Sequence, residues 1–250
     1  MLCCHGMLTL HRLANVLYPP ACPRCDRSLP RADAALCRSC EGAMPRPGRP
    51  LCLSCGIGLS GAFDARLVCA RCRARPPAFA GARAPWLYLG AGRQAIRLLK
   101  YRHRRRLGRW LAETMAHRAG EDLPVAQIDL VVPVPLHWLT RRLRGANHAA
   151  ELSARVASAL HKPHDALALR RRRWTPSQTR QRTWQERWRN VRESFQADPR
   201  RVQGQGILLV DDVLTTGATA QACAQALRAA GSREVFVLTA ARTPLQWRTR

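Results

Sequence analysis

Acidic residues and lysine are both scarce in this chain of 250 residues. Sixteen acids stand against 42 bases, and only two of those bases, Lys100 and Lys162, are lysines, so the formal net charge is +26. A field of this sign attracts polyanions: nucleic acid, anionic membrane surfaces or phosphorylated metabolites. A GC-rich genome would explain arginine in place of lysine, but it would not explain the shortage of acids.

Long apolar runs are also missing, and no stretch is long and apolar enough to span a bilayer. Residues 1–17 lack a charged segment followed by an unbroken apolar run, because histidine, arginine and asparagine interrupt them, so we expect no signal peptide. The expected compartment is therefore the cytoplasm. Cysteines stay reduced there, and closely spaced cysteines are then more often metal ligands than disulfides.

Two common nucleotide-binding motifs are absent from the sequence. The Gly-Lys-Ser/Thr of a Walker A loop does not occur, and Gly90-Ala91-Gly92 lacks the third glycine of a dinucleotide fingerprint. The sequence therefore supports neither of these two classes of nucleotide-binding protein.

Cysteine, by contrast, is abundant near the start of the chain. Ten of the 11 cysteines lie within residues 1–80, a segment rich in proline and glycine with little periodicity, which is typical of a fold held by metal. Four pairs have the Cys-x-x-Cys spacing: Cys22/Cys25, Cys37/Cys40, Cys52/Cys55 and Cys69/Cys72. Each pair can turn two thiolates onto one ion, and two pairs complete a tetrahedron, so the eight ligands predict two structural Zn²⁺ ions.

The sequence leaves open which pairs share an ion. Sequential pairing gives two tandem ribbons and crossed pairing gives an interleaved site. The short separations of 11 and 13 residues within the first two and the last two pairs favour the sequential form. A redox dithiol is a poor alternative, because the four copies lie outside a strand–helix–strand unit. We expect Cys223, in the middle of a predicted helix, to serve packing.

Apolar runs and amphipathic stretches alternate from Pro85 onward, after a linker or extended segment at 75–85. We expect strands at 86–89, 128–134, 166–169, 206–210 and 234–239, and helices within 94–117, at 147–160 and at 216–230, the last stopped by Gly231. Strands that alternate with helices predict an α/β fold with a mostly parallel sheet. The predicted domains are a small Cys-rich zinc-binding domain at 1–80 and an α/β domain at 85–250.

Carboxylates and an anion-binding turn come together in residues 211–219. Asp211 and Asp212 end a predicted buried strand, which is where open α/β sheets place their ligands. The small and hydroxyl-bearing residues that follow are Thr215, Thr216, Gly217, Ala218 and Thr219. They let backbone N–H groups approach an anion at the positive end of the next helix. Acceptors for sugar hydroxyls beside donors for a phosphate suit a ribose 5-phosphate, although an ordinary helix cap and turn would use similar residues.

The same segment resembles the signature of type I phosphoribosyltransferases, in which a pair of acids is followed by Thr-Gly-x-Thr. The resemblance implies that Asp211 and Asp212 bind the ribose hydroxyls of phosphoribosyl pyrophosphate, and that residues 215–219 bind its 5′-phosphate. It also implies Mg²⁺ held mainly by the substrate's own oxygens.

Residues 129–135 resemble the strand that leads into the pyrophosphate loop of this family. That loop would cover 136–144, with cations at His137, Arg141, Arg142 and Arg144. The family's flexible loop corresponds to 170–187, which includes Thr175, Gln178 and Arg182.

Taken in chain order, these motifs resemble a ComF/GntX-type protein over residues 17–242. The motifs are the cysteine pairs, Leu99-Lys100-Tyr101, Val-Pro-Val-Pro-Leu at 132–136, Arg144-Gly145-Ala146-Asn147 and the segment 211–219. The resemblance implies a double zinc ribbon joined to a phosphoribosyltransferase-like domain. It further implies a role in DNA uptake during natural competence, with single-stranded DNA and other competence proteins as partners.

Two basic segments bear on these partners. Residues 93–109 contain eight lysines and arginines, and residues 170–192 contain nine arginines interleaved with Trp174, Trp184 and Trp188. Guanidinium groups that track phosphates beside indoles that stack on bases suit single-stranded nucleic acid. A solvated face, packed tryptophans or a pyrophosphorylated substrate would account for the same residues.

Three functions therefore stay open. The first is a competence protein that binds phosphoribosyl pyrophosphate and acts with single-stranded DNA. The second is a nucleobase-salvage transferase, for which the sequence offers no base-recognition segment. The third is a non-catalytic module that binds the ligand or DNA.

Overall fold

The computed structural model describes residues 20–29, 31, 33–60, 67–99, 105–136, 148–171 and 194–244. In chain order its helices and strands are α2 (Arg38–Gly42), α3 (Ala70–Ala74), β1 (Gly81–Arg83), β2 (Trp86–Leu87), α4 (Gly90–Leu99), α5 (Arg105–Asp122), η1 (Val125–Gln127), β3 (Leu130–Pro133), α7 (His148–Ala159), β4 (Leu169–Arg171), β5 (Phe195–Ala197), α9 (Pro199–Val202), β6 (Gly206–Leu214), α10 (Ala218–Ala229) and β7 (Glu234–Arg242). Among the described residues, none of the helices combines the length and the apolar character that crossing a membrane requires.

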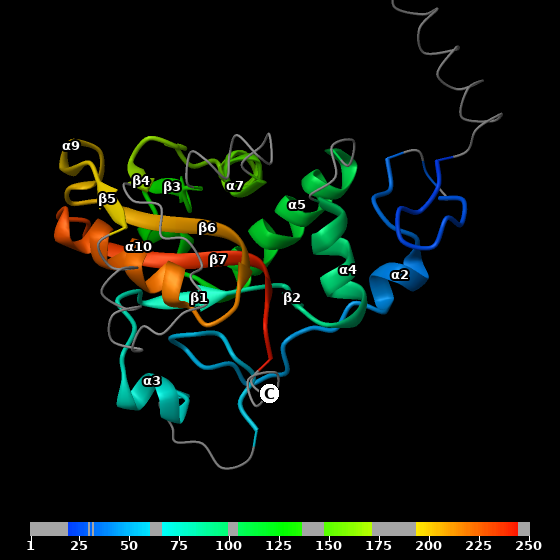
Figure 1. Cartoon of the computed structure of the whole chain (residues 1–250), viewed down its shortest axis with the longest axis horizontal. Helices are drawn as coiled ribbons and strands as arrows, with labels where there is room; N and C mark the ends of the chain where they lie inside the picture. Colours follow the sequence, from blue (N-terminus) through cyan, green and yellow to red (C-terminus); the bar gives the residue numbers. More distant parts are fainter. Residues whose placement is uncertain are drawn as a thin grey trace, which may run out of the picture.

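A parallel sheet forms the centre of the molecule (Figure 1). Its strand order is β1-β7-β6-β3, and β2 pairs with the far end of β7, again in parallel. The long strands β6 and β7 lie in the middle, where both of their faces are covered. Continuous apolar runs are typical of strands buried on both faces, and Ile207–Val210 and Val235–Leu238 are fully buried here. The predicted α/β fold with a mostly parallel sheet is confirmed.

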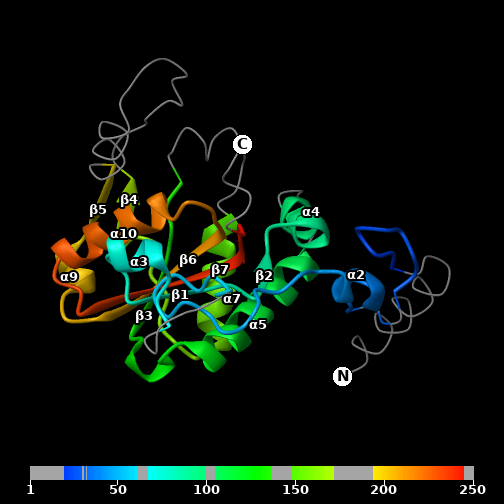
Figure 2. The same ribbon diagram turned by 90° about the horizontal axis from the view of Figure 1, so that it is seen from below.

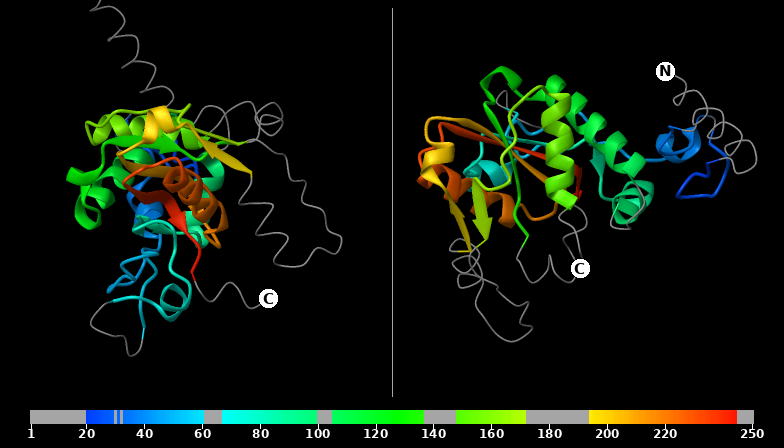
Figure 3. Two further views of the ribbon diagram at one scale, coloured as in Figure 1. Left: turned by 90° about the vertical axis from the view of Figure 1, so that its left-hand side faces the viewer. Right: turned by 90° about the horizontal axis from the view of Figure 1, so that it is seen from above.

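Different elements cover the two faces of the sheet (Figure 3). On one face, α4, α5 and α7 pack against residues such as Leu208 and Leu238. On the other, α10, α9 and a hairpin of β4 and β5 pack against residues such as Leu209 and Val237. Successive strand residues point to opposite faces, so these neighbouring apolar residues supply two separate cores.

Several predicted elements match closely. The helix expected at 147–160 is α7, and the helical region 94–117 is α4 followed by α5. Helix α10 ends at Ala229, and Gly231 has a φ of +91°, the left-handed conformation of a glycine that terminates a helix. Residues 100–104, where a break between helices is predicted, lie outside the described part of the chain.

Other elements differ from the prediction. Strand β6 runs four residues past the expected end at Val210, because it keeps pairing with β7 as far as Leu214, opposite Arg242. The strand expected at 166–169 instead begins at Leu169 and pairs with Phe195–Ala197, in a hairpin that the sequence did not predict. Strand β1 lies within the expected linker. The domain bounds 1–80 and 85–250 stay a prediction.

Candidate functional site

The segment 211–219 forms a strand end, a tight turn and a helix start. Asp211 and Asp212 are half-buried in β6, and Oδ1 of Asp211 accepts a hydrogen bond of 2.8 Å from the Asp212 N–H. The turn covers 215–217, and α10 begins at Ala218. The structure therefore brings all seven predicted ligand-binding residues onto one continuous strand–turn–helix unit.

The turn presents backbone and hydroxyl donors at the start of α10. Gly217 precedes the helix with a φ of +79° and a ψ of 2°. The Thr216 hydroxyl accepts a hydrogen bond of 3.2 Å from the Ala218 N–H, and the side chains of Thr215 and Thr219 are exposed. A helix of 12 residues directs its free N–H groups and positive dipole end to this point. The unit is therefore suited chemically to an anion beside two carboxylates.

The positive φ at Gly217 gives a testable requirement for glycine. A Cβ built on Gly217 would come no nearer than 3.9 Å to Leu214 Cδ1, so a methyl group has space and only the backbone conformation opposes it. We expect Gly217→Ala to destabilise the protein by about 1 kcal/mol, measured by chemical denaturation. Gly120→Ala is the control, because that glycine lies in α5 with nothing within 4 Å of its Cβ position. Alanine should be neutral or stabilising there, so equal losses from the two substitutions would contradict the expectation.

The carboxyl end of β3 lies beside this unit. Pro133 pairs with Val210, and the Val134 N–H donates a hydrogen bond of 2.8 Å to the Val210 carbonyl. The chain that leaves β3 towards the predicted pyrophosphate loop therefore starts next to Asp211. Ligands of open α/β sheets bind outside the carboxyl ends of neighbouring strands.

Most of the two predicted basic loops lies outside the described residues. Of the loop 136–144 only Leu136 is described, and of the stretch 170–187 only Arg170 and Arg171. The residues that fall outside are His137, Arg141, Arg142, Arg144, Trp174, Thr175, Gln178, Arg182, Trp184 and Trp188. Their predicted roles stay predictions.

Cys223 is a packing residue, as expected. Its side chain in α10 is fully buried, and burial, followed by the negative charge of Asp211, raises the pKa of the Cys223 thiol. A thiol held neutral in this way is a poor nucleophile.

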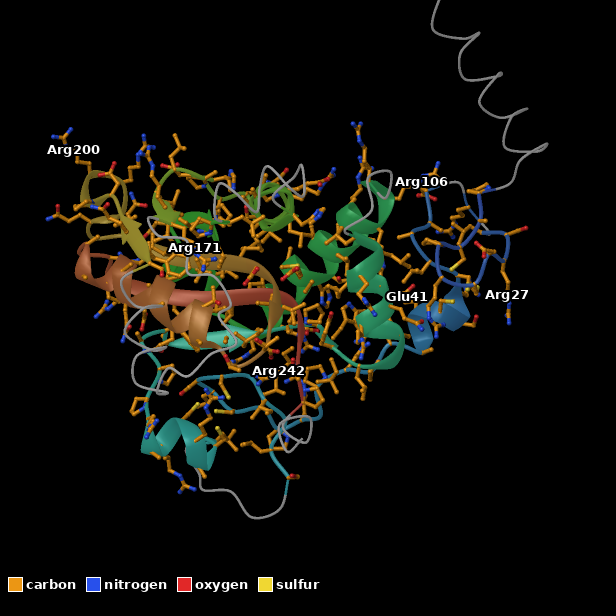
Figure 4. The ribbon with its side chains drawn as sticks, in the orientation of Figure 1. Arg27, Glu41, Arg106, Arg171, Arg200 and Arg242 are labelled. Atoms are coloured by element: carbon orange, nitrogen blue, oxygen red, sulfur yellow. The ribbon has the colours of Figure 1, made fainter. Side chains whose placement is uncertain are left out.

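Arg171, labelled in Figure 4, lies over the Phe195 ring on the same side of the sheet, 5.5 Å from its centroid.

The cysteine pairs assemble sequentially into two groups of four. Cys22, Cys25, Cys37 and Cys40 form one group, and Cys52, Cys55, Cys69 and Cys72 form the other. Within each group the four sulfur atoms lie within 4.8 Å of one another. We call these groups the first and the second ribbon. The alternative left open by the sequence, a crossed pairing, is not the one that the chain adopts.

The two ribbons repeat the same local structure. The first cysteine of each accepts a hydrogen bond at its sulfur from the N–H of the third: Cys37 to Cys22 at 3.5 Å and Cys69 to Cys52 at 3.4 Å. An antiparallel bridge closes each first pair, Ala21 with Ser28 and Leu51 with Gly58. A short helix follows each third cysteine, α2 in the first ribbon and α3 in the second.

The surroundings of some of the sulfurs favour thiolates, which are the form that binds metal, whereas burial raises the pKa of the Cys40 thiol. The Ser39 hydroxyl lies 3.3 Å from Cys37 Sγ and lowers the pKa of Cys37 to about 6. Hydrogen bonds from the thiols of Cys55 and Cys72 lower the pKa of Cys52. Four cysteine sulfurs at this separation suit a tetrahedral structural Zn²⁺ site, with no open position for chemistry.

Two buried arginines attach the second ribbon to the sheet. Arg83 of β1 and Arg242 of β7 are 7% and 6% exposed. Arg83 donates a hydrogen bond of 2.9 Å to the Leu53 carbonyl, and Arg242 donates to the Cys55 carbonyl (Figure 4). Burial lowers the pKa of both arginines. The negative charge of Asp122, followed by those of Cys52 and Cys55, acts against that shift at Arg83, and the charge of Cys55 does so at Arg242. No sequence signal separates these two arginines from the many exposed ones.

The first ribbon lies at the other end of the molecule, next to α4 (Figure 2). Arg24 joins the two, because its Nε donates to Gln94 Oε1 at 2.7 Å and its Nη1 to Cys40 Sγ at 3.2 Å. Arg46 stacks over the Trp86 ring at 4.8 Å. The hydrogen bond between Arg24 and Gln94 is exposed, in contrast to the buried arginines beside the second ribbon.

Comparisons with known proteins found a family match to the cysteine-rich segment and a relative that matches most of the chain. The family described as the double zinc ribbon domain matches residues 13–75. The chain is 31% identical over 196 residues to the DNA utilization protein YhgH of Escherichia coli (strain K12), a match that covers 73% of this chain and 81% of that protein.

Solved structures are similar over about half of the chain. The allosteric regulatory enzyme of purine biosynthesis is 23% identical with a TM-score of 0.38, over 53% of this chain and 25% of the enzyme. Glutamine phosphoribosylpyrophosphate amidotransferase from B. subtilis is 22% identical with a TM-score of 0.37, over 52% and 25%. The chain thus spans a quarter of each of these longer enzymes.

Proposed function

Because the chain belongs to the ComF/GntX-type family of the DNA utilization protein YhgH, we propose that it binds phosphoribosyl pyrophosphate and acts in the use of incoming DNA. One observation carries the ligand half of this proposal. Two carboxylates, a turn rich in hydroxyls and the start of α10 lie in one unit, directly beside the carboxyl end of β3. That unit combines acceptors for ribose hydroxyls with donors for a phosphate.

Each part of the ligand has a partner in this arrangement. Asp211 and Asp212 accept from the ribose hydroxyls, and residues 215–219 bind the 5′-phosphate. The chain that leaves β3 binds the pyrophosphate. Mg²⁺ held by the substrate's own oxygens would neutralise part of the charge of its phosphates. In a turnover, an acceptor nucleophile such as a nucleobase nitrogen would bond to the ribose C1 as the C1–O bond to pyrophosphate breaks. The protein's own part would be to position the ribose and the pyrophosphate and to stabilise the charge that develops.

Calorimetry on the full chain tests the ligand. Phosphoribosyl pyrophosphate with Mg²⁺ is expected to bind with saturable heat, whereas ribose 5-phosphate alone should bind more weakly because it lacks the pyrophosphate. Absence of heat from the wild type would overturn the proposal. Pyrophosphate release across a panel of nucleobases then separates the alternatives, since release with a free base would identify a salvage transferase.

The DNA half of the proposal rests on the exposed arginines of the first ribbon and α5. A cavity of about 380 Å³ between them is lined by apolar side chains and by Arg105 and Arg106. Arg27 and Arg106, both exposed, lie at this end of the molecule (Figure 4). Guanidinium groups around an apolar hollow provide contacts for phosphates beside a surface on which bases can lie.

Salt dependence measures such phosphate contacts. For Arg106→Gln we expect weaker binding of a short oligothymidylate, and a slope of log K against log salt that is shallower by about 0.7, the contribution of one phosphate contact. Arg200→Gln is the matched control, because it removes one exposed arginine from α9 at the opposite end of the molecule (Figure 4). Equal changes of affinity and of salt slope in the two variants would show that Arg106 acts only through the protein's overall charge.

A further inference from the structure

One side chain of the second ribbon reaches the segment 211–219. Arg71 lies in α3, between Cys69 and Cys72. Its Nη2 donates a hydrogen bond of 2.7 Å to the carbonyl oxygen of Thr216, which is 145 residues away in sequence. The metal-binding turn of the ribbon and the anion-binding turn before α10 are therefore in direct contact.

Two more contacts hold the same region. The Ala78 N–H, on the chain that leaves the second ribbon, donates a hydrogen bond of 2.8 Å to Gln221 Oε1 in the first turn of α10. The Gln221 N–H in turn donates to the Gly217 carbonyl at 2.8 Å. Arg242, which binds the Cys55 carbonyl, pairs in the sheet with Leu214, the residue before the turn. The chain that leaves the ribbon thus contacts α10 after Thr216, and Arg242 connects the ribbon to the strand before it.

We propose that Arg71 is a positioning residue for the turn 215–217, so that the metal site of the second ribbon fixes the shape of the ligand site. This inference rests on the proposed function, in which that turn binds a phosphate. The C=O and N–H of a trans peptide point in opposite directions. When Arg71 holds the Thr216 carbonyl towards the ribbon, the Gly217 N–H is directed away from it. Arg71 thereby orients one of the N–H donors at the start of α10.

The metal matters because it fixes the backbone from which Arg71 extends. With Cys69 and Cys72 bound to one ion, the two residues between them cannot rearrange. An arginine on a fixed base loses less conformational entropy when it forms its hydrogen bond. Its positive charge also lies next to the site of the proposed phosphate, within the screening length of physiological salt.

Three variants test this role: Arg71→Met, Arg71→Lys and, as control, Arg38→Met. Arg38 is an exposed arginine between Cys37 and Cys40 of the first ribbon, so its loss matches the change in charge. Zinc content should stay at the wild-type value in all three, which separates loss of the contact from loss of the ribbon. For Arg71→Met we expect hydrogen exchange at residues 215–221 to be about tenfold faster. Arg71→Lys, which keeps one donor, should recover part of the protection.

Ligand affinity provides the second measurement. Phosphoribosyl pyrophosphate with Mg²⁺ should bind Arg71→Met about tenfold more weakly than wild type or Arg38→Met. Unchanged exchange at 215–221 in Arg71→Met would overturn the positioning role, whether or not the ligand binds. Faster exchange in Arg71→Met together with a wild type that binds no ligand would support the positioning role and refute the proposed function instead.

Discussion

Replacement of Cys52 by serine is expected to destabilise the protein more strongly than the matched replacement of Cys22. Both cysteines are the first ligand of their ribbon, and both are fully buried. Each variant should lose one metal ion. We expect Cys52→Ser to lower the free energy of unfolding by about 3–5 kcal/mol, and Cys22→Ser to lower it by no more than about 2 kcal/mol.

The expected difference in stability follows from the arginines that lose their partners when each ribbon opens. Four thiolates around one Zn²⁺ carry a net charge of about −2, and Arg83 and Arg242 bring two buried positive charges to the second ribbon. When that ribbon opens, Arg242 loses the Cys55 carbonyl and Arg83 loses the Leu53 carbonyl, and both lose the negative charge of the thiolates while β1 and β7 still hold them. Arg83 keeps the Ala82 carbonyl and the charge of Asp122, so Arg242 is the more affected of the two by this loss. A buried charge without a partner is strongly destabilising. Arg24 of the first ribbon binds Gln94 at an exposed position, where water can replace the contact.

Tryptophan fluorescence during chemical denaturation measures this effect. Trp86 and Trp110 stack with ring centroids 5.7 Å apart between β2 and α5, so their emission reports the unfolding of this core, which also includes Cys22 of the first ribbon. Zinc analysis confirms that each variant has lost a single ion. Equal losses of stability in Cys52→Ser and Cys22→Ser would show that the buried arginines do not link the second ribbon to the sheet.

The sequence predicted local features best where one residue type has a single strong preference. Cysteine spacing identified all eight ligands, because two thiolates two residues apart readily share an ion. The apolar run at 206–210 predicted a buried strand, and the helix expected at 216–230 is α10, which begins two residues later at Ala218. What the sequence could not give was the end of β6. Aspartate is depleted in strands, yet β7 continues alongside this segment, where Thr239 pairs with Asp211 and Ala241 with Val213.

Contacts between residues far apart in the sequence could not be predicted, because they depend on three-dimensional neighbours and not on a local pattern. Arg83 and Arg242 are two of many arginines, and only the three-dimensional neighbourhood of Cys52 and Cys55 shows why they are buried. Strand β5 has three residues, and its partner β4 lies on the far side of the basic segment, so the local pattern is too short to predict the pairing. The sequence around Arg71 and the sequence around Thr216 likewise give no indication of the hydrogen bond between them.

The double substitution Asp211→Asn/Asp212→Asn is expected to weaken binding of phosphoribosyl pyrophosphate by about 100-fold or more. Each carboxylate would lose charge-assisted hydrogen bonds to ribose hydroxyls, which contribute about 1.5–3 kcal/mol each. Asparagine keeps the size of the side chain, and the bond from the Asp212 N–H to the carboxylate oxygen of Asp211 can be kept by an amide oxygen. The fold of β6 should therefore survive, and the denaturation midpoint should stay near that of the wild type.

The direction in which the affinity changes distinguishes direct contact with the ribose from attraction by the protein's overall positive charge. The double variant removes two negative charges from a chain that already carries +26, so its field attracts a polyanion more strongly. Field effects alone therefore predict tighter binding, and only direct contact with the ribose predicts the loss. Asp129→Asn is the control, because that carboxylate lies at the opposite end of the parallel strands, where it accepts from the Gly206 N–H at 2.8 Å and from Arg233 at 2.9 Å. Calorimetry at one fixed salt concentration should show unchanged affinity for Asp129→Asn. Unchanged or tighter binding by the double variant would mean that the ribose is held elsewhere, even if the turn before α10 still binds the phosphate.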